Sequence, residues 1–385
     1  MSKFKNSIAQ DNVQFPIETV IETVPGAAYS RAIIFMNVNL ATSLLPGVTT
    51  AKAGDKIELN SSNYSALTAG GLKNWLIPFF TSAVSAKLAV ALYDTETQDT
   101  SGETPVTIPA TAPLETVYKN EKYYAYFKFL YSDDATEYQT GNASLAQLCL
   151  ADALYSAHWI GISDVNALTS TSAIVTALNA VNAKSRVVYN PDTTINAALA
   201  QLGDTLGAVN STGTPIGNDV DMHAFSTIKA SGALDSDGNR LNLTSTEKTA
   251  LDLQHIGYNT YVGNDTANVV TEGSLTLNGD VVGAEWVKAY IEFVCKVKTA
   301  EYITQRNKFR NNEQYQAILL LMSAQIKPFV DMGRLADFTI TAPLFKDLPA
   351  SADSFVVPNA WRASYIDRLR SVTVYGKLYV TQPTK

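Results

Sequence analysis

The sequence predicts a mixed α/β (α+β) protein, and three observations carry that prediction. Between residues 123 and 209, short strand-like runs alternate with helical segments, which is typical of an α/β domain with a mainly parallel sheet. Strands and long helices continue in mixed order after residue 213, and an amphipathic strand lies near each end of the chain. The predicted parts are an N-terminal arm (1–28), an α/β domain (29–212), a C-terminal core domain (213–370) and a C-terminal arm (371–385).

Composition excludes several classes of function. The chain has 385 residues, of which 46% are hydrophobic and 17% charged, so it can bury a sizeable core. Its net charge is -7 and no run of Lys or Arg stands out, which gives no basis for nucleic-acid binding. No apolar signal core follows Met1 and no apolar run approaches the length of a membrane span. We therefore expect a protein made and kept in a cytoplasm, without a membrane partner.

The first half of the chain predicts strands that alternate with helices. The expected strands are residues 32–38, 87–93, 123–131, 157–162 and 186–189, and the expected helices are residues 65–82, 144–155, 170–182 and 194–209. Residues 94–120 are rich in Thr, Pro and Glu without a helical period, and we expect a surface loop or small hairpin there. No Gly-rich fingerprint follows any strand, so the sheet carries no sign of a nucleotide site.

The second half opens with a strand-like run at 220–228 and continues with a helix at 244–255 and a strand at 257–263. Thr244 and Glu247 form the signature of a helix start. Two long helices follow, from Gly283 to about Ile303 and from about Asn312 to Ile326. The second is apolar nearly all round its axis, so we expect it to be buried and to end before Pro328.

Candidate chemical sites are weak throughout. His158, His223 and His255 lack a second ligand at metal spacing, and we interpret them as structural polar groups. The run 235–240 begins like a calcium loop, but Arg240 occupies the position that requires Gly, so a turn is the better interpretation. The carboxylate pairs Asp133/Asp134 and Asp219/Asp221 lack any sign of burial with a partner and are taken as solvated turns. We predict no catalytic residue, no cofactor and no metal, and expect that the protein is not an enzyme.

Cys149 and Cys295 are the two cysteines, and each lies in a helix-like apolar stretch. A disulfide between them is one interpretation, and two buried thiols are the other. The expected cytoplasmic location favours the thiols.

Each end of the chain carries a strand with one apolar face. The apolar positions are Val13, Phe15, Ile17 and Ile21 in the N-terminal arm and Val372, Val374, Leu378 and Val380 in the C-terminal arm. Two arrangements are open on pattern alone. Each strand can pair within its own subunit, or it can add to the sheet of a neighbouring subunit through main-chain hydrogen bonds.

Four pieces of the chain resemble the C-terminal domain of contractile tail sheath proteins of bacteriophages. They are residues 219–228, residues 243–262, the run Thr271-Glu272-Gly273-Ser274 followed by residues 285–291, and the late strand near 373–380. The resemblance covers roughly the last 170 residues, and the region 213–370 would then be the sheath core domain.

The resemblance implies a homo-oligomer of stacked hexameric rings, or helical strands, connected by exchange of both arms. Its further implied partners are the tail tube, the baseplate and the tail terminator, with no cofactor. Its implied location is the virion tail, after assembly in the host cytoplasm. Contraction would then drive the tube through the host envelope during genome ejection. Lys288, Lys296 and Lys298 would be candidates for facing an acidic tube, and a solvated helix face is the alternative interpretation.

Three alternatives stay open. The sheath of a phage-derived contractile injection particle would polymerise and contract by the same mechanism. A tail tube or capsid subunit would also assemble, although tube subunits favour a mostly β fold. An α/β enzyme would need a cleft with converging polar groups, and the sequence gives no sign of one.

Overall fold

The structure is a computed structural model of the whole chain. It describes nine stretches of residues. These are residues 27–45, 51–99, 106–169, 171–207, 224–225, 228–262, 265–304, 311–348 and 360–366. The predicted C-terminal arm (371–385) and residues 1–26 of the predicted N-terminal arm lie outside these stretches.

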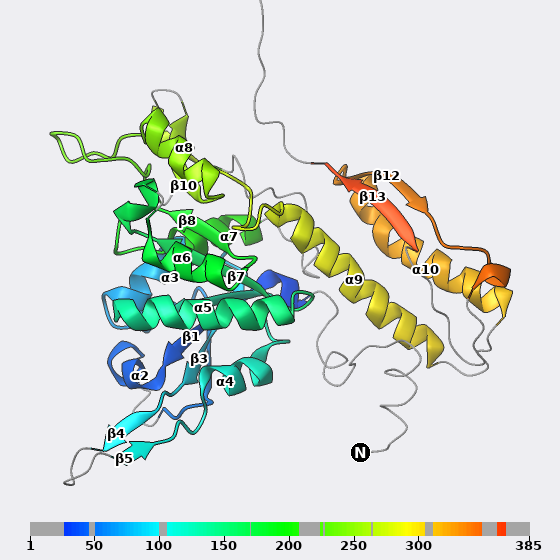
Figure 1. The fold of residues 1–385 in the computed structure, drawn as a ribbon, viewed down its shortest axis with the longest axis horizontal. Helices are drawn as coiled ribbons and strands as arrows, with labels where there is room; N and C mark the ends of the chain where they lie inside the picture. The colour runs from blue at the N-terminus through cyan, green and yellow to red at the C-terminus, as the bar shows by residue number, and fades with distance from the viewer. Residues whose placement is uncertain are drawn as a thin grey trace, which may run out of the picture.

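A nine-stranded mixed sheet forms the main body, in the order β2-β3-β1-β6-β7-β8-β10-β11-β9 (Figure 1). The run from β3 to β10 is parallel, and β2, β11 and β9 add antiparallel pairings at the two sides. The strands are β1 (Arg31–Asn37), β2 (Lys56–Leu59), β3 (Lys87–Tyr93), β6 (Phe127–Tyr131), β7 (Ala157–Ile162), β8 (Arg186–Tyr189), β9 (Ala224–Phe225), β10 (Gly257–Val262) and β11 (Asp265–Glu272). The mixed α/β class is therefore confirmed.

Helices cover both faces of this sheet, which explains why the sequences of its central strands are continuous apolar runs. The helices of the body are α2 (Val38–Leu44), α3 (Gly71–Ser82), α4 (Leu114–Glu121), α5 (Ala135–Ala151), α6 (Ala173–Ala180), α7 (Ala197–Gly207) and α8 (Ser245–Leu253). Single-turn helices are η3 (Ala27–Ser30), η4 (Tyr64–Ala66) and η5 (Val165–Thr169).

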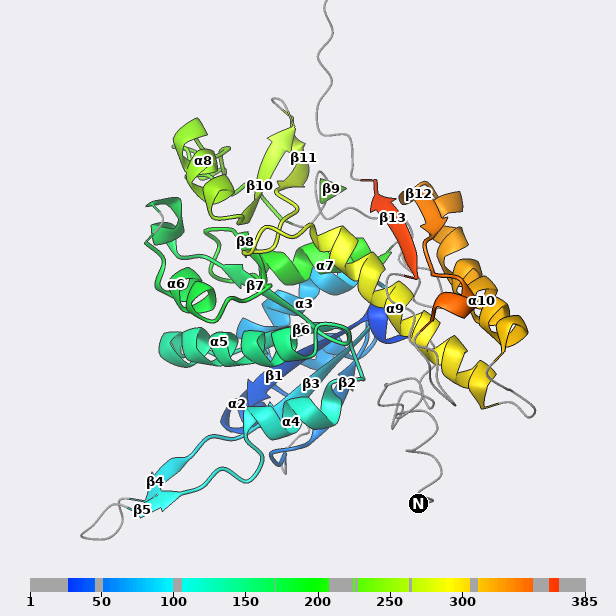
Figure 2. The ribbon, with the colours of Figure 1, turned by 45° about the vertical axis from the view of Figure 1, so that its right-hand side comes forward.

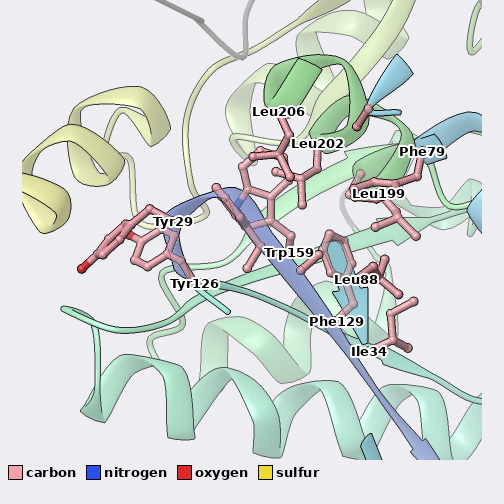
Figure 3. Close-up of a cluster of buried hydrophobic side chains, with 14 of the residues drawn as sticks. Tyr29, Ile34, Phe79, Leu88, Tyr126, Phe129, Trp159, Leu199, Leu202 and Leu206 are labelled. Carbon is pink, nitrogen blue, oxygen red and sulfur yellow. The ribbon is translucent and has the colours of Figure 1, made fainter. Parts of the chain in front are cut away.

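Successive residues of β1 serve opposite faces of the sheet. Ile34 lies in the core that α3 and α7 cover, while Phe35 lies in the core that α4 and α5 cover. Figure 3 shows the first of these cores, where Phe79 of α3 and Leu202 of α7 meet strand side chains such as Ile34. The alternating side chains of the strands thus form two cores, with α3 and α7 on one face of the sheet and α4 and α5 on the other.

The region 94–120 contains both a hairpin and a helix. Strands β4 (Thr97–Asp99) and β5 (Val106–Ile108) pair antiparallel and project from the body (Figure 2), which confirms the small hairpin. Helix α4 was missed because it spans only eight residues, too few to show a clear period. Asp94 fixes the base of the hairpin by accepting from the backbone nitrogens of Thr111 (2.8 Å) and Ala112 (2.7 Å).

Other predicted boundaries shift by several residues. The helix expected at 65–82 begins at Gly71, because Gly70 adopts φ 112° and residues 64–66 form a separate turn. The helix expected at 144–155 runs from Ala135 to Ala151, started by the Asp134 side chain, which accepts from Glu137 N. Residue 213, the predicted start of the core domain, falls between β8 and β10, which pair with each other in one sheet.

A second, smaller unit lies beside the body. It contains α9 (Val282–Ile303), α10 (Asn312–Asp331), η6 (Phe345–Asp347) and the two-stranded sheet of β12 (Leu335–Ile340) and β13 (Trp361–Tyr365). Helix α9 lies between the body and the rest of this unit (Figures 1 and 2). The prediction of α9 is confirmed to within one residue at its start.

The prediction for α10 is wrong in two respects. The helix continues through Pro328 to Asp331, because Phe329 in this last stretch is buried against Tyr290 of α9 and its packing offsets the backbone hydrogen bond that the proline removes. Its apolar run is not buried on all sides, since Leu320 is 71% exposed while Ile318 and Leu319 are buried. Helix α10 is therefore amphipathic and keeps an open outer face.

Candidate assembly surface

The two-stranded sheet β12–β13 is the feature best suited to join another chain. Its register pairs Leu335 with Tyr365 and Ile340 with Trp361, with an irregularity between Ala336 and Thr339. One further backbone bond continues each end, from Ile366 N to Arg334 O (2.9 Å) and from Thr341 N to Ala360 O (3.0 Å).

One face of this sheet is anchored on the helices. Trp361, Ala363 and Tyr365 alternate along β13 and pack against the main apolar core, while Arg362 and Ser364 between them are exposed. This period of two is that of a half-buried strand. The sheet thus has a fixed inner face and a solvated outer face.

Both edges of the β12–β13 sheet lack a strand partner within the described part of the chain. A two-stranded sheet is marginal alone, and unpaired edge N–H and C=O groups are a template for another strand. An extended segment of suitable pattern could add to either edge by main-chain hydrogen bonding. This geometry offers two places for incoming strands.

The predicted arm residues lie outside the described residues, on both the N-terminal side (Val13, Phe15, Ile17, Ile21) and the C-terminal side (Val372, Val374, Leu378, Val380). Whether they fill the edges of β12–β13 therefore stays a prediction. The described chain nevertheless brings one arm close, because β13 ends only six residues before residue 371.

Helix α9 is bound to the body through an aromatic cluster. The ring of Tyr29 stacks on Tyr126 (centroids 4.8 Å apart) and meets Tyr290 of α9 edge-on (5.4 Å). The hydroxyl oxygen of Tyr29 lies 2.6 Å from Leu154 O in the body and 3.1 Å from Ala289 O in α9. Further along, Phe127 of β6 packs edge-on against Trp286 (5.3 Å). These contacts place α9 between the body and the rest of the second unit (α10, η6, β12 and β13), which we call the assembly unit.

The three candidate tube-facing lysines all lie on α9 but do not share one side of it. Lys288 is exposed, and Lys298 forms an ion pair with Glu301 (2.8 Å). Burial lowers the pKa of Lys296, and the nearby Glu292 opposes that shift. Two positions along a helix correspond to a rotation of about 200°, so Lys296 and Lys298 project to different sides. Lys288 lies about 80° around the helix from each of them, so it can share a partner surface with Lys296 or with Lys298 but not with both.

The carboxyl edge of the parallel strands, where α/β proteins bind ligands at the reversal of strand order, is closed by side chains. The reversal lies between β1 and β6. There the carboxylate of Glu137 accepts from Asn37 Nδ2 (3.0 Å), Tyr93 Oη (3.0 Å) and Ser132 Oγ (2.6 Å). All its partners are residues of the same chain, so this carboxylate is satisfied as a structural group.

The other candidate polar groups also have internal partners. His158 is 2% exposed, and its ring nitrogens lie 2.7 Å from Ser185 Oγ and 2.9 Å from Asn142 Oδ1. Burial lowers the pKa of His158 to about 3, so the ring is neutral. This Ser–His–Asn arrangement is sealed, since Ser185 and Asn142 are both fully buried. It holds β7, β8 and α5 together.

The calcium-like run is a turn, as interpreted. Asp235 Oδ1 accepts from the backbone nitrogens of Asp237 (2.9 Å) and Asn239 (2.8 Å), so its carboxylate closes the turn. Within the described stretches, no group of three or more His, Cys, Asp or Glu side chains could hold a metal ion. His223 and the pair Asp219/Asp221 lie outside those stretches.

Cys149 and Cys295 are free and buried, which confirms the two-thiol interpretation over a disulfide. Burial raises the pKa of both thiols to about 12. They are inert packing groups. Among the described helices, none combines the length and apolar character that crossing a bilayer demands.

Comparison with solved structures gives two matches of equal quality. A chain of the anti-feeding prophage (AFP) baseplate superposes with a TM-score of 0.60 at 12% identity, covering 94% of this chain and 95% of that one. A chain of the extracellular contractile injection system PVC sheath complex, in its contracted state, gives the same values. The chain has the fold of contractile sheath proteins. No protein-family model and no curated protein sequence matches it.

The resemblance drawn from the sequence is therefore confirmed at the level of the fold. Both superpositions extend over nearly the whole chain, so the body belongs to the shared sheath fold as well as the C-terminal region. The assembly surface β12–β13 was missed by sequence reasoning. Its signal was present in β13, where Trp361, Ala363 and Tyr365 alternate with polar residues, and weak in β12, where an irregularity breaks the alternation.

Proposed function

We propose that this protein is the sheath subunit of a contractile phage tail, which polymerises around a tail tube and contracts to drive it through a host envelope. The observation that carries the proposal is the β12–β13 sheet with two unpartnered edges in the described chain, in a protein with a sheath fold. The alternating strands near both chain ends supply suitable occupants for those edges.

Strand addition explains how subunits would stay connected while they move. A strand donated by one subunit and accepted by the next is a heterologous contact, and such a contact builds an open helical assembly. Each donated strand would be joined to its own subunit by the chain that follows the N-terminal strand or precedes the C-terminal one, while the acceptor sheet is fixed on α9 and α10. Subunits could then rotate as rigid bodies during contraction without losing the lattice. Energy would come from the better-packed contracted state, with no nucleotide consumed.

A phage-derived contractile injection particle is the second candidate. It is favoured by the origin of the two matched structures, an anti-feeding prophage baseplate and an extracellular contractile injection system. In the phage-tail form, the further partners would be the tube, baseplate and tail terminator, with assembly in the host cytoplasm. Isolation of the particle with or without packaged DNA separates the two candidates.

Electron microscopy of the purified full-length protein tests the central proposal. We expect hollow cylinders, in one of two diameters that correspond to extended and contracted lattices. Deletion of residues 11–24 or of residues 371–381 should leave a folded monomer, with unchanged circular dichroism, that no longer forms cylinders. A compact monomer at high concentration of the full-length protein would refute the sheath function.

Point variants in the C-terminal arm give a matched comparison. Val374→Asp places a charge on the apolar face of the predicted strand, and Thr373→Asp places the same charge on its polar face. We expect Val374→Asp to abolish cylinders and Thr373→Asp to retain them. If both variants form cylinders, or neither does, the predicted two-faced strand in this arm is wrong.

Contact with the tube is tested through α9. The double variant Lys288→Glu and Lys296→Glu should weaken assembly around an acidic tube while leaving tube-free cylinders intact. Lys298→Glu is the control, because its side chain is engaged with Glu301 on another side of the helix. Loss of tube-free cylinders in the double variant would instead place these lysines between subunits.

A further inference from the structure

The connection between β11 and α9, residues 273–281, passes over the start of β8 and is held there by three consecutive residues. These are Lys184, Ser185 and Arg186, which we call the 184–186 clasp. The clasp belongs to the body, and the connection leads into the helix that supports the assembly unit. The Thr271-Glu272-Gly273-Ser274 run of the sequence lies at the beginning of this connection.

Arg186 is the centre of the clasp and is fully buried. Its guanidinium donates from Nη2 to Gly273 O (2.5 Å), from Nη1 to Leu275 O (3.1 Å) and from Nε to Gln201 Oε1 (3.2 Å). A buried guanidinium that loses its acceptors leaves an uncompensated charge in a low-dielectric interior. Both carbonyls of the connection are therefore held strongly in position.

Two glycines make room for this arrangement. A Cβ at Gly257, the first residue of β10, would collide with the Arg186 guanidinium. Gly273 has φ +86°, a conformation that favours glycine, and its Cβ position would lie 3.2 Å from Gly257 Cα. The start of β8, the start of β10 and the connection thus meet at one buried guanidinium. Arg186, Gly257 and Gly273 are the residues that allow this close approach.

Lys184 and Ser185 hold the rest of the connection. The amide nitrogen of Leu277 donates to Ser185 O (2.9 Å). Lys184 Nζ lies 2.7 Å from Asp280 Oδ2 and 3.5 Å from Glu285 Oε2 in the first turn of α9. The clasp therefore reaches from the end of β11 into α9 itself.

The same turn of α9 supports the assembly unit. Trp286 packs on Phe127 of the body, and Gly283 faces the hydroxyl of Tyr365 in β13 so closely that a Cβ would collide with it. The aromatic contacts along α9, with the bond from Tyr29 Oη to Ala289 O, attach the helix itself to the body, whereas the clasp holds the connection that leads into it. The hydrogen bonds and ion pairs of the clasp are directional, and they fix both the position and the angle of this helix.

We propose that the 184–186 clasp is the mechanical coupling between the body and the β12–β13 assembly unit, so that a pull on the unit turns the whole subunit. This inference rests on the proposed sheath function for its purpose. The rigid joint that the clasp would make, however, is a property of the single subunit. It can therefore be tested without assembly, and its failure would leave the sheath proposal untouched.

Pulsed electron paramagnetic resonance on the unassembled full-length subunit measures the coupling. Spin labels at Leu253→Cys on α8 and Leu320→Cys on α10 report the distance between body and assembly unit, since both positions are over 70% exposed. We expect one narrow distance distribution in the otherwise native protein. Arg186→Lys, which cannot reproduce the guanidinium bonds, and Lys184→Ala should broaden it or add a second peak.

The native thiols do not interfere with labelling, because Cys149 and Cys295 are buried and their pKa values are raised to about 12. Leu145→Ala is the control variant. Leu145 is fully buried in the core between β1, β3, α4 and α5, away from the connection, so its truncation destabilises the body without touching the clasp. It should leave the distance distribution narrow.

Hydrogen exchange gives a second measurement. The Leu277 amide should lose roughly tenfold of its protection in Lys184→Ala, as expected for a weakened local hydrogen bond. If Arg186→Lys does not fold, Lys184→Ala carries both measurements. An unchanged distribution in the clasp variants, or equal broadening in Leu145→Ala, would overturn the proposal.

Discussion

The buried His158 should make the stability of this protein fall in mild acid by a defined amount. Burial lowers the pKa of the ring to about 3, from an ordinary value of 6.5. The folded-state pKa lies below the unfolded one, so the unfolded chain takes up the proton first. The stabilisation is fully present above pH 6.5 and is lost progressively as the pH falls toward 3.

The magnitude follows from linkage. Each pH unit between the two pKa values costs about 1.4 kcal/mol, so moving from neutral pH to pH 4.5 should cost about 2.7 kcal/mol from this residue. That is a substantial part of the net stability of about 5–15 kcal/mol typical of folded proteins. The partners Asn142 Oδ1 and Ser185 Oγ do not offset it, because neither carries a negative charge that would compensate a protonated ring.

Urea unfolding between pH 4.5 and 7.5 measures this contribution as a difference between proteins. His158→Gln should lower the free energy of unfolding at neutral pH but flatten its dependence on pH. Ser185→Ala is the control, because it removes one hydrogen bond while keeping the imidazole, and it should retain the native slope. If the difference between the native protein and His158→Gln stays constant with pH, the burial argument for His158 is wrong.

Three further predictions concern other parts of the chain. Gly283→Leu should displace Tyr365 and prevent cylinder formation in electron microscopy while the melting temperature changes little, and normal cylinders would contradict the role of this contact. Thr244→Ala removes the side chain that accepts from Glu247 N in a capping box and should cost about 1 kcal/mol in urea unfolding; no change would mean that α8 needs no cap. Cys149 and Cys295 should resist thiol reagents until the chain unfolds, and rapid labelling of native protein would show that their cover opens.

Much of the fold was predictable because its signals are local. Strands β7 and β8 were predicted to the residue, since short apolar runs between turns mark strands buried in a parallel sheet. The α8 cap was predicted from Thr244 and Glu247, and both bonds of the capping box are present. The order of strands in the sheet was not predictable, because it depends on contacts between residues far apart in sequence.

Wrong predictions arose where local pattern and tertiary environment disagree. The apolar run of α10 indicated burial, but burial depends on which sides of the helix meet a neighbour. Leu320 faces outward and Ile318 inward, although both belong to the same run. Pro328 indicated a helix end, but the burial of Phe329 against the core offsets the hydrogen bond that the proline removes, and the helix continues to Asp331.

Sequence reasoning located assembly in the two arms and could not identify an acceptor for them. The acceptor candidate, β12–β13, is too short and irregular to stand out, and what makes it suitable is a spatial property, two edges without a strand partner in the described chain. The same spatial view joins that sheet to the body through one turn of α9, where Gly283, Glu285 and Trp286 meet β13, the 184–186 clasp and β6 respectively. If arms from neighbours occupy the acceptor, the force they apply reaches the body along α9, through this turn and through the neighbouring contacts of Tyr29 with Ala289 and Tyr290.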